Sequence, residues 1–452
     1  MPDEREELLE IAQKVVRKAR DHVEVAEVSI GSSWDLSAKV RLGKTELVEE
    51  AGGRGASLRV IKDGRLAMTS TSDLSESGLS LLVDDAVELA DLAEKDDLLG
   101  PAPVEDLARG PFQDLDLFDQ AVSAIDADEA LERARRAEKA ALDADKRITL
   151  SEGATFSRTS STRVMVLSGG FEGTQRGSYA SLNVVPLAEE SDGTKRRGYY
   201  WTAKRHLEDL EPELSVGREA TRRTLQKLGA SKIDTKEMPV IFDNDSSRSI
   251  LSTFAGCLMG GALWRKSSYL LGRLNSEVAN PLVEIIDDPL VQRGPGSRPY
   301  DGEGLTSRAN QIVKSGKLQS YILDCYSGRK LNLPSTASAS RGGGSVGPST
   351  SNLIMQAGKL SVEELIESTE EALLVTEMMG FGFNGITGDF SRGAAGFLIR
   401  GGKIVQPVNE VTISANLDDM MKNIDAIAND LELKTSVAAP SFRISKMTVS
   451  GN

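Results

Sequence analysis

The chain begins with an amphipathic run and continues with alternating runs. In segment 3–20, apolar residues fall on one side of a helix and charged residues on the other. Alternating apolar and polar residues then predict strands. The Asp63-Gly64 pair predicts a hairpin between two of them, because both turn residues tolerate a positive φ. The strands expected here are His22–Ile30, Leu36–Leu42, Ala56–Ile61 and Arg65–Ser70.

Blocks of helix and strand pattern continue to about residue 235. Helices are predicted from about Ser75 to Ala93, over Asp126–Ala144 and over Glu211–Leu228, where strong helix formers are dense. Thr149–Tyr200 alternates in strand fashion and is interrupted by glycines. The segment Gly100–Pro111 contains proline and glycine and is interpreted as a connector.

A buried helix is the main feature of the second half. A strand over Met238–Phe242 leads into this helix, predicted over 245–271, where Leu251, Phe254 and Leu258 recur at helical spacing. Polar residues just before it supply capping side chains, and we interpret the carboxylates of Asp243 and Asp245 in this way. Its glycines, Gly256, Gly260 and Gly261, would let another backbone approach closely.

Beyond Pro281 the pattern is mostly short strands and glycine turns, including a hairpin at Gly401-Gly402. Two more helices are predicted, Ser361–Met379, opened by a Ser361-x-x-Glu364 capping box, and about Leu417–Leu431.

Strands in runs, with helices that do not alternate regularly with them, predict an α+β fold. We expect an N-terminal helix-and-hairpin domain over 1–235, with its connector near 100–111. A C-terminal, mainly antiparallel β domain is expected over 236–452, built around the helix 245–271.

The composition of the chain argues against several classes of function. The chain has 452 residues, with 39% hydrophobic residues, 27% charged residues and a formal net charge of −14. This charge argues against nucleic-acid binding, which needs clustered lysine and arginine. The apolar run Phe254–Trp264 is too short to span a bilayer, and the acidic start MPDEREELLE does not resemble a signal peptide. With only two cysteines, we expect a reducing cytoplasm and no membrane partner.

Candidate nucleophiles lie on the buried helix. Ser252, Thr253 and Cys257 would each need a base, and the histidines are only His22 and His206. Cys257 is the only residue between 251 and 274 whose side chain is a common metal ligand. A lone cysteine on an apolar helix is usually a core residue.

Two glycine motifs resemble nucleotide-binding loops. Gly342-x4-Gly347-Pro348-Ser349 has proline where a phosphate-binding loop has lysine, and we interpret Pro334–Asn352 as a mobile loop at a groove or interface. Gly380-x-Gly382-x-x-Gly385 follows a predicted helix, the reverse of the dinucleotide order, so its glycines are expected to serve turns or close strand packing.

Several segments, in this order and spacing, resemble the TldD/PmbA family, also called modulators of DNA gyrase. The central one is LSTFAGCLMGGALWRKSSYLLGRL at 251–274 with NSEVANPLVEIIDD after it. The others are RLGKTE at 41–46, GASLRV at 55–60, TSDL at 71–74, FLIRGGKI at 397–404 and IANDL at 427–431.

The resemblance implies a two-subunit cytoplasmic metalloprotease that takes in unfolded or flexible peptides. One subunit type carries HExxxH on the buried helix, with two histidines on the metal and a glutamate as general base. Here the matching window holds Ser252, Thr253 and Cys257, and the segment 432–444, where a cysteine ligand is expected, has none. The resemblance therefore implies a PmbA/TldE-type subunit with a degenerate site.

We accordingly expect no catalytic residue, cofactor or metal in this chain, and zinc in a TldD-like subunit that forms a heterodimer with it. The alternative is a stand-alone homodimer that binds peptides or another partner without hydrolysis. A third hypothesis is a hydrolase that uses Cys257 or Ser252.

Overall fold

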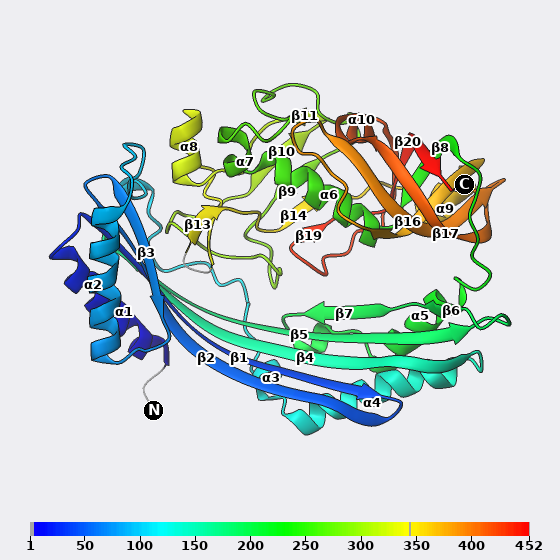
Figure 1. Cartoon of the computed structure of the whole chain (residues 1–452), viewed down its shortest axis with the longest axis horizontal. Coiled ribbons are helices and arrows are strands. Elements are labelled where there is room, and N and C mark those ends of the chain that lie inside the picture. The colour runs from blue at the N-terminus through cyan, green and yellow to red at the C-terminus, as the bar shows by residue number, and fades with distance from the viewer. Residues whose placement is uncertain (1–3, 343–344, 452) are drawn as a thin grey trace.

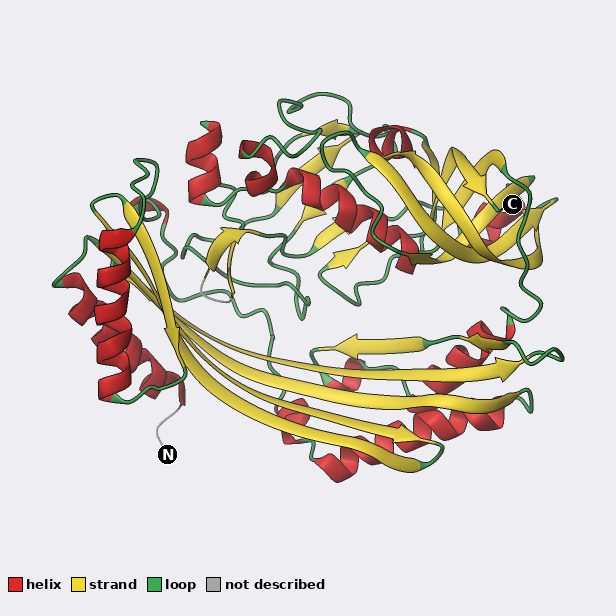
Figure 2. Cartoon of the chain, viewed as in Figure 1, coloured by secondary structure: helices red, strands yellow, loops and turns green. Residues whose placement is uncertain are grey.

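The computed structural model describes residues 4–342 and 345–451, and it has two lobes (Figure 1). One lobe is a long curved sheet with helices on its outer side, and the other combines smaller sheets with helices (Figure 2). Strands in runs with helices set beside them confirm the predicted α+β class.

The long sheet has seven strands in the order β3-β2-β1-β4-β5-β6, with β7 also paired to β5. Neighbouring strands are antiparallel throughout, so most turns between them are local hairpins. β4 spans 20 residues, well beyond the usual strand length of about 3–10 residues. The strands are β1 Val25–Arg41, β2 Lys44–Lys62, β3 Arg65–Thr71, β4 Ile148–Leu167, β5 Phe171–Glu189, β6 Lys195–Arg197 and β7 Tyr200–Lys204.

β1 corrects the prediction of two separate strands at 22–30 and 36–42. The polar stretch between them stays extended, because Gly31 pairs with Gly55 of β2 and with Arg163 of β4. Hydrogen bonding on both sides therefore outweighs the weak strand preference of glycine and serine there. The hairpin at Asp63-Gly64 is confirmed, with both residues at positive φ.

Helices cover the outer face of this sheet in two groups. α1 and α2 pack on one end through residues such as Leu8, Val28 and Leu58, and α4 and α5 pack on the other end through residues such as Phe156 and Leu182. The strand residues that contact these helices occupy every second position and are buried. The positions between them point to the opposite, inner face and are mostly polar. The helices are α1 Glu4–Arg20, α2 Glu76–Leu92, α3 Gln120–Ala124, α4 Ala127–Ala144 and α5 Glu213–Leu225, with short turns η1 Val104–Asp106 and η2 Leu207–Asp209.

The second lobe is built on a six-stranded sheet in the order β17-β16-β15-β8-β20-β18, in which β17 also pairs with β20. A five-stranded sheet, β11-β10-β9-β14-β19, and the hairpin β12-β13 complete it. The strands are β8 Lys236–Phe242, β9 Ile285–Asp287, β10 Asn310–Lys314, β11 Lys317–Leu318, β12 Ala339–Gly342, β13 Ser345–Pro348, β14 Leu353–Met355, β15 Glu371–Met379, β16 Asp389–Arg400, β17 Lys403–Asn416, β18 Ile424–Ile427, β19 Val437–Ala438 and β20 Phe442–Ser450. The helices are α6 Asn244–Leu258, α7 Gly260–Trp264, α8 Cys325–Leu331, α9 Val362–Glu367 and α10 Leu417–Lys422.

The predicted helix Ser361–Met379 is wrong beyond its first turns. The capping box of Ser361 and Glu364 is present, but α9 ends at Glu367 and β15 begins at Glu371. β15 lies in the middle of the sheet, parallel to β8 and antiparallel to β16, and Leu373 and Leu374 face different cores. Burial on both faces selects a strand in spite of helix-forming side chains.

The other two long helices are also shorter than predicted. In 417–431, α10 ends at Lys422 and the chain turns into β18, which pairs with β20. In 245–271, α6 ends at Leu258, because Met259 adopts an extended conformation and pairs with Ile322. A second short helix, α7, then begins at Gly260.

The two lobes share contacts rather than a bare linker. The predicted connector Gly100–Pro111 contains η1, and its Leu107 pairs with Leu305 of the second lobe. A shared core joins Phe171 of β5 to Tyr300, whose ring centroids lie 4.8 Å apart. The division into domains 1–235 and 236–452 stays a prediction.

Within residues 4–342 and 345–451, none of the helices combines the length and the apolar composition that a bilayer crossing would need.

Candidate functional site

The helix α6 has one buried face and one open face. Asp243 caps its start by accepting a hydrogen bond from Ser246 N at 2.8 Å, as the sequence predicted. The buried face belongs to the core of the second lobe and includes Leu251, Phe254 and Leu258. The open face presents residues at helical spacing that are small or polar: Asp245, Arg248, Ser249, Ser252, Thr253 and Gly256.

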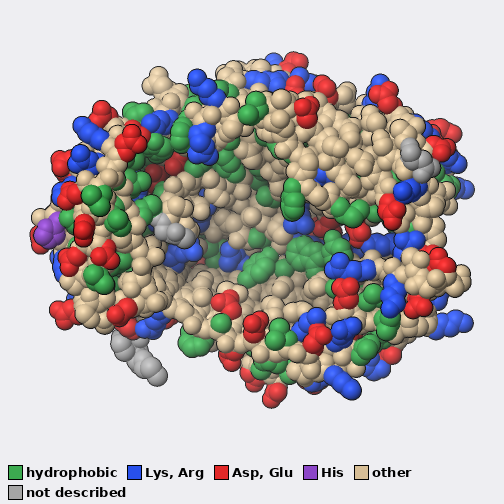
Figure 3. All heavy atoms as spheres, viewed as in Figure 1, with side chains coloured by type: hydrophobic (Ala, Val, Ile, Leu, Met, Phe, Trp, Pro, Cys, Tyr) green, Lys and Arg blue, Asp and Glu red, His purple; other side chains and the backbone are tan. Residues whose placement is uncertain are grey.

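This open face turns toward the long sheet. Arg248 lies over the ring of Trp201 in β7, 5.8 Å from its centroid, and also hydrogen-bonds to Thr435. Cavities open along α6 at both ends and have walls from both lobes. The space between the lobes is visible as a hollow in Figure 3. We call this space the cleft.

The structure separates the three candidate residues of α6. Ser252 is exposed on the open face, whereas the Thr253 hydroxyl donates to Ser249 O at 2.9 Å and accepts from Arg392 Nη2 at 3.4 Å. Cys257 points into the core and is 3% exposed. Burial raises the pKa of the Cys257 thiol to about 11, so it stays protonated at neutral pH and is a poor nucleophile.

The larger cavity lies at the end of α6 and has a volume of about 1200 Å³. Gly256 and Met259 form part of its wall, and Trp264 and Tyr326 supply an aromatic pair at 5.9 Å. Further wall residues come from β2, β3 and the segment 94–99 of the first lobe and from β13 of the second, so this cavity lies where the two lobes meet.

A buried carboxyl group also lines this cavity. Burial, and then the charges of Asp301 and Asp324, raise the pKa of Glu303 to about 7. Its Oε2 accepts a hydrogen bond from Cys325 N at 2.8 Å, which anchors the start of α8. Glu303 therefore changes charge near neutral pH at the cavity wall.

The smaller cavity lies at the start of α6 and has a volume of about 410 Å³. Asp245 and Ser249 of α6 meet Tyr199 and Glu377 there. No three His, Cys, Asp or Glu side chains gather into a metal-binding group anywhere in the described part of the chain.

The inner face of the long sheet forms the opposite wall of the cleft and is rich in small hydroxyl residues. Ser157 Oγ donates to Ser37 Oγ at 3.0 Å, and Thr159 Oγ1 donates to Asp35 Oδ1 at 2.6 Å. Directly opposed residues of antiparallel strands point to the same side, so these pairs form a polar ladder across β1 and β4. These hydroxyl pairs make this stretch of the wall polar.

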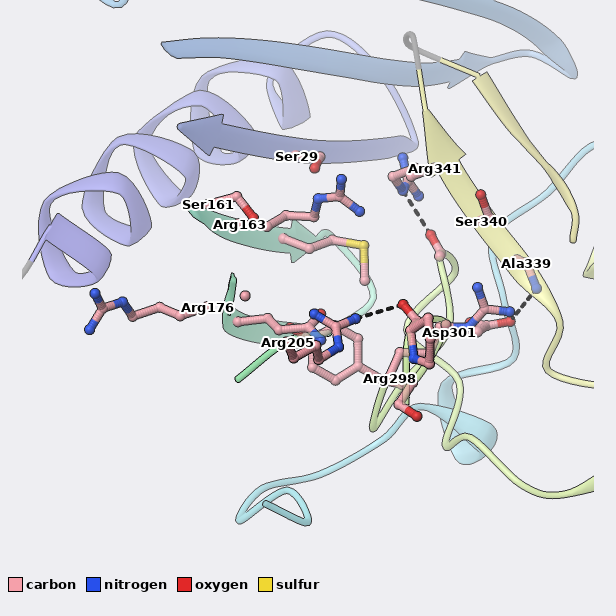
Figure 4. Close-up of a pocket in the computed structure, with 18 residues that line it drawn as sticks. Ser29, Ser161, Arg163, Arg176, Arg205, Arg298, Asp301, Ala339, Ser340 and Arg341 are labelled. Atoms are coloured by element: carbon pink, nitrogen blue, oxygen red, sulfur yellow. Dashed lines mark hydrogen bonds between the residues drawn. The ribbon is translucent and has the colours of Figure 1, made fainter. Parts of the chain in front are cut away.

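A third cavity of about 260 Å³ lies between the lobes, beside this inner face (Figure 4). We call it the arginine pocket, because five arginines line it: Arg163, Arg176, Arg205, Arg298 and Arg341. Sequence reasoning missed this pocket. Its arginines come from five separate segments, and no spacing between them signals that they meet.

Other predicted site residues lie elsewhere. His206 is buried in the loop after β7, where its Nε2 lies 2.9 Å from Asp116 O, so its ring is held by the segment that follows the connector. The stretch predicted as a mobile loop over 334–352 contains the hairpin β12-β13, whose residues 343–344 lie outside the described residues.

The glycines of the second motif act in turns and close packing, as predicted. Gly380 has φ +78°, and a Cβ on Gly382 would lie 1.9 Å from Ser391 O. The element before the motif is β15 rather than a helix, and β16 follows it. The arrangement is thus a β-turn region and not a strand-to-helix nucleotide loop.

Comparison with known proteins agrees with this architecture. Profiles of the PmbA/TldA metallopeptidase domain 1, central domain and C-terminal domain match residues 26–90, 121–228 and 235–451. The chain is 36% identical to the metalloprotease PmbA of Escherichia coli O157:H7 over 94% of this chain and 92% of the relative. It is 27% identical to a metalloprotease TldD homologue of Haemophilus influenzae over 60% and 61% of the two chains.

Solved structures show the same fold over the full length. A candidate modulator of DNA gyrase from Bacteroides thetaiotaomicron superposes with a TM-score of 0.92 at 28% identity, covering 100% of both chains. TldE from Thermococcus kodakarensis superposes with a TM-score of 0.87 at 19% identity, covering 98% of this chain and 100% of that one, and this likeness concerns the fold alone.

The long sheet, the second lobe and the helix at the cleft define a metallopeptidase-type α+β protein. With its full-length relatives, the chain belongs to the PmbA/TldD metallopeptidase family.

Proposed function

We propose that this chain is the supporting subunit of a cytoplasmic metallopeptidase and carries no catalytic metal site of its own. It would pair with a TldD-like subunit that holds zinc. The observation that carries the proposal is the chemistry of the open face of α6. Where metal-bearing relatives are expected to carry HExxxH, the side chains toward the cleft are hydroxyls and a glycine, and Cys257 points into the core.

The cleft supports a role in holding peptide substrate. An unfolded peptide exposes its main-chain N–H and C=O groups. These groups can form hydrogen bonds with polar residues of a binding surface whatever the sequence of the peptide. The ladder of serine and threonine on the inner face offers such a wall, and the cavities along α6 leave room beside it. Broad sequence tolerance follows from recognition of the main chain.

An exposed apolar patch supports association with a second subunit. Phe381 is 95% exposed, Ile386 63% and Met379 50%, all in or beside the loop between β15 and β16. Exposed apolar side chains that cluster in this way are typical of protein interfaces. We infer that this patch contacts the TldD-like subunit.

The test is reconstitution. We expect the tagged chain to recover an equimolar second chain bearing HExxxH from its own cytoplasm. We also expect peptide hydrolysis to require both chains and to stop with a zinc chelator. Ser252→Ala and Cys257→Ala in this chain should leave the hydrolysis rate unchanged.

Two outcomes would overturn the proposal. Hydrolysis by this chain alone, lost in Ser252→Ala or Cys257→Ala, would establish the hydrolase hypothesis. Recovery of the chain only with itself, without hydrolysis, would establish the stand-alone homodimeric binding protein.

A further inference from the structure

Two of the five arginines in the arginine pocket already have partners for their charge. Arg341 pairs with the buried carboxylate of Glu27 and donates to Gly302 O at 2.7 Å. Arg176 lies on the ring of Phe118, 3.6 Å from its centroid, and extends away from the other labelled arginines in Figure 4.

Two further arginines are held by carbonyl oxygens instead of a paired carboxylate. Arg205 Nε donates to Gly294 O at 2.8 Å and its Nη2 to Pro295 O at 2.6 Å. Arg298 Nη2 donates to Ser349 O at 3.3 Å, while its Nε is buried and has no hydrogen-bond partner in the described part of the chain. Burial lowers the pKa of both guanidinium groups, and at Arg298 the charges of Asp301 and Asp287 offset this effect only in part.

The acidic side chain in the pocket wall already accepts hydrogen bonds from backbone N–H groups. Asp301 is the one acidic residue among the described residues that line it. Its Oδ1 accepts from Glu303 N and Leu305 N, and its Oδ2 accepts from Ala339 N. These backbone bonds tie the Asp301 carboxylate to its own loop and to the start of β12.

Arg163 is the arginine that is free to receive a ligand. It lies on the inner face of β4 and is exposed, and its side chain makes no hydrogen bond or ion pair with another described residue. Figure 4 shows it on the same side of the pocket as Arg341. Guanidinium groups gathered around one cavity repel each other, and an anion placed among them removes that cost.

The surroundings indicate what kind of anion fits. A volume of about 260 Å³ is below the range of about 300–1,000 Å³ typical of small-molecule sites, so the pocket suits the end of a longer ligand. Ser29, Arg163 and Arg341 also line a neighbouring cavity of about 450 Å³ along the inner face of the sheet. Its other wall residues are small, Gly31, Gly55, Ala56 and Ser57 among them, and leave room for a peptide main chain.

We propose that the arginine pocket binds the C-terminal carboxylate of an extended peptide that lies along the inner face of the long sheet. Arg163 receives the carboxylate through paired N–H donors, the geometry for which a guanidinium fork is suited. This inference rests on the proposed peptide-binding function and adds the feature of the peptide that this chain selects. It also accounts for a basic cluster in a chain whose net charge is −14.

The test compares three fluorescein-labelled peptides of one flexible ten-residue sequence by fluorescence anisotropy. One has a free C-terminal carboxylate, one a C-terminal amide, and one the amide with a single internal aspartate. Each is titrated with the full chain, alone and with its metal-bearing subunit. We expect the free acid to bind about tenfold or more tightly than the amide, as a charge-assisted pair predicts.

Variants assign this preference to the pocket. Arg163→Gln should remove it and leave amide binding unchanged, and Arg163→Lys should retain part of it. Arg147→Gln is the matched control, because it removes the same charge from an exposed arginine just before β4, outside the pocket. It should change neither affinity by more than about twofold. Thermal unfolding of each variant checks that the fold is intact, and Arg163→Gln should match the wild type because the Arg163 side chain is bonded to none of the described residues.

The outcomes separate the two proposals. Equal binding of free acid and amide overturns the carboxylate site and leaves the peptide-binding role standing. A preference restored by the internal aspartate assigns the pocket to acidic side chains and overturns terminal recognition. Failure of all three peptides to bind overturns both proposals.

Discussion

Asp243 is a helix cap whose charge is costly. Its side chain accepts from Ser246 N, yet burial, with the nearby charge of Asp245, raises its pKa to about 7. The unfolded carboxyl ionises near pH 3.8, so the wild type loses stability as the pH rises from about 4 to 7 and levels off above that. Asp243→Asn keeps the cap acceptor and removes the ionisation. We expect the free energy of unfolding of Asp243→Asn, relative to the wild type, to rise between pH 5 and pH 8 in urea denaturation.

Asp243→Ala separates the two roles of this residue. It loses the cap as well as the charge, so it should be about 1 kcal/mol less stable than Asp243→Asn at every pH. Parallel stability curves for wild type and Asp243→Asn would show that the carboxyl is ionised throughout.

At the scale of the element, two glycines of the predicted buried helix have opposite roles. A Cβ on Gly260, at the start of α7, would lie 2.3 Å from Ser327 Cβ of α8, whereas a Cβ on Gly256 would have no atom within 4 Å. Gly260→Ala should therefore destabilise the fold by about 1–3 kcal/mol through overpacking. Gly256→Ala should stabilise it by about 0.5–1 kcal/mol through helix propensity. Equal effects of the two substitutions on the midpoint of urea unfolding would contradict this assignment.

The elements also show where local signals are sufficient. The capping box of Ser361 and Glu364 predicted the start of α9, because both hydrogen bonds lie within one turn. The end of α9 was missed, because β15 is a strand only through its pairing with β8 and β16. The prediction of close backbone approach was right for Gly260, whose N–H donates to Ile322 O at 2.9 Å, and wrong for Gly256 and Gly261. Approach of another backbone depends on which side of the helix is covered.

At the scale of the whole molecule, a buried ion cluster links the lobes. Glu27 of β1 pairs with Arg59 of β2 at 2.9 Å and with Arg341 of β12. Glu27→Gln leaves two buried guanidinium groups without their shared counter-charge, so the free energy of unfolding should fall by about 3–5 kcal/mol at neutral pH. Burial raises the pKa of Glu27, but the charges of Arg341 and Arg59 outweigh this effect and hold the pKa below its ordinary 4.5. Its stabilising effect is therefore present above pH 4.5 and should vanish as the pH falls through the lowered pKa.

Glu46→Gln is the control for this cluster, because Glu46 pairs with Lys39 near the surface and its loss should change stability far less. If both glutamine variants unfold at the same urea concentration as the wild type, the buried cluster has no structural role.

The exposed patch around Phe381 yields the prediction for assembly. Phe381→Ser should weaken binding to the metal-bearing subunit by about tenfold or more, because buried aromatic side chains dominate interface energies. Its thermal unfolding should not change, since the side chain is 95% exposed. Leu92→Ser, which alters a 78% exposed leucine at the end of α2, should leave binding intact, and equal binding by all three proteins in analytical ultracentrifugation would refute the patch.

The sequence by itself determined the features that neighbouring residues control. The hairpins at Asp63-Gly64 and Gly401-Gly402, the cap at Asp243 and the helix α4 all follow from turn chemistry, capping and propensity within a few residues. The segments between 41–46 and 427–431 that resemble the family were also sufficient, in their order and spacing, to predict it. Each of these segments meets local packing requirements of the same fold.

Only the tertiary structure decided the features that distant segments make together. The break of the buried helix at Met259 requires Ile322, and the strand β15 requires partners on both sides. The arginine pocket needs both lobes to meet, because its arginines come from β4, β5, β12 and two loops. Contacts between residues hundreds of positions apart leave no periodicity in the chain, so the cleft and its charge emerge only when the lobes come together.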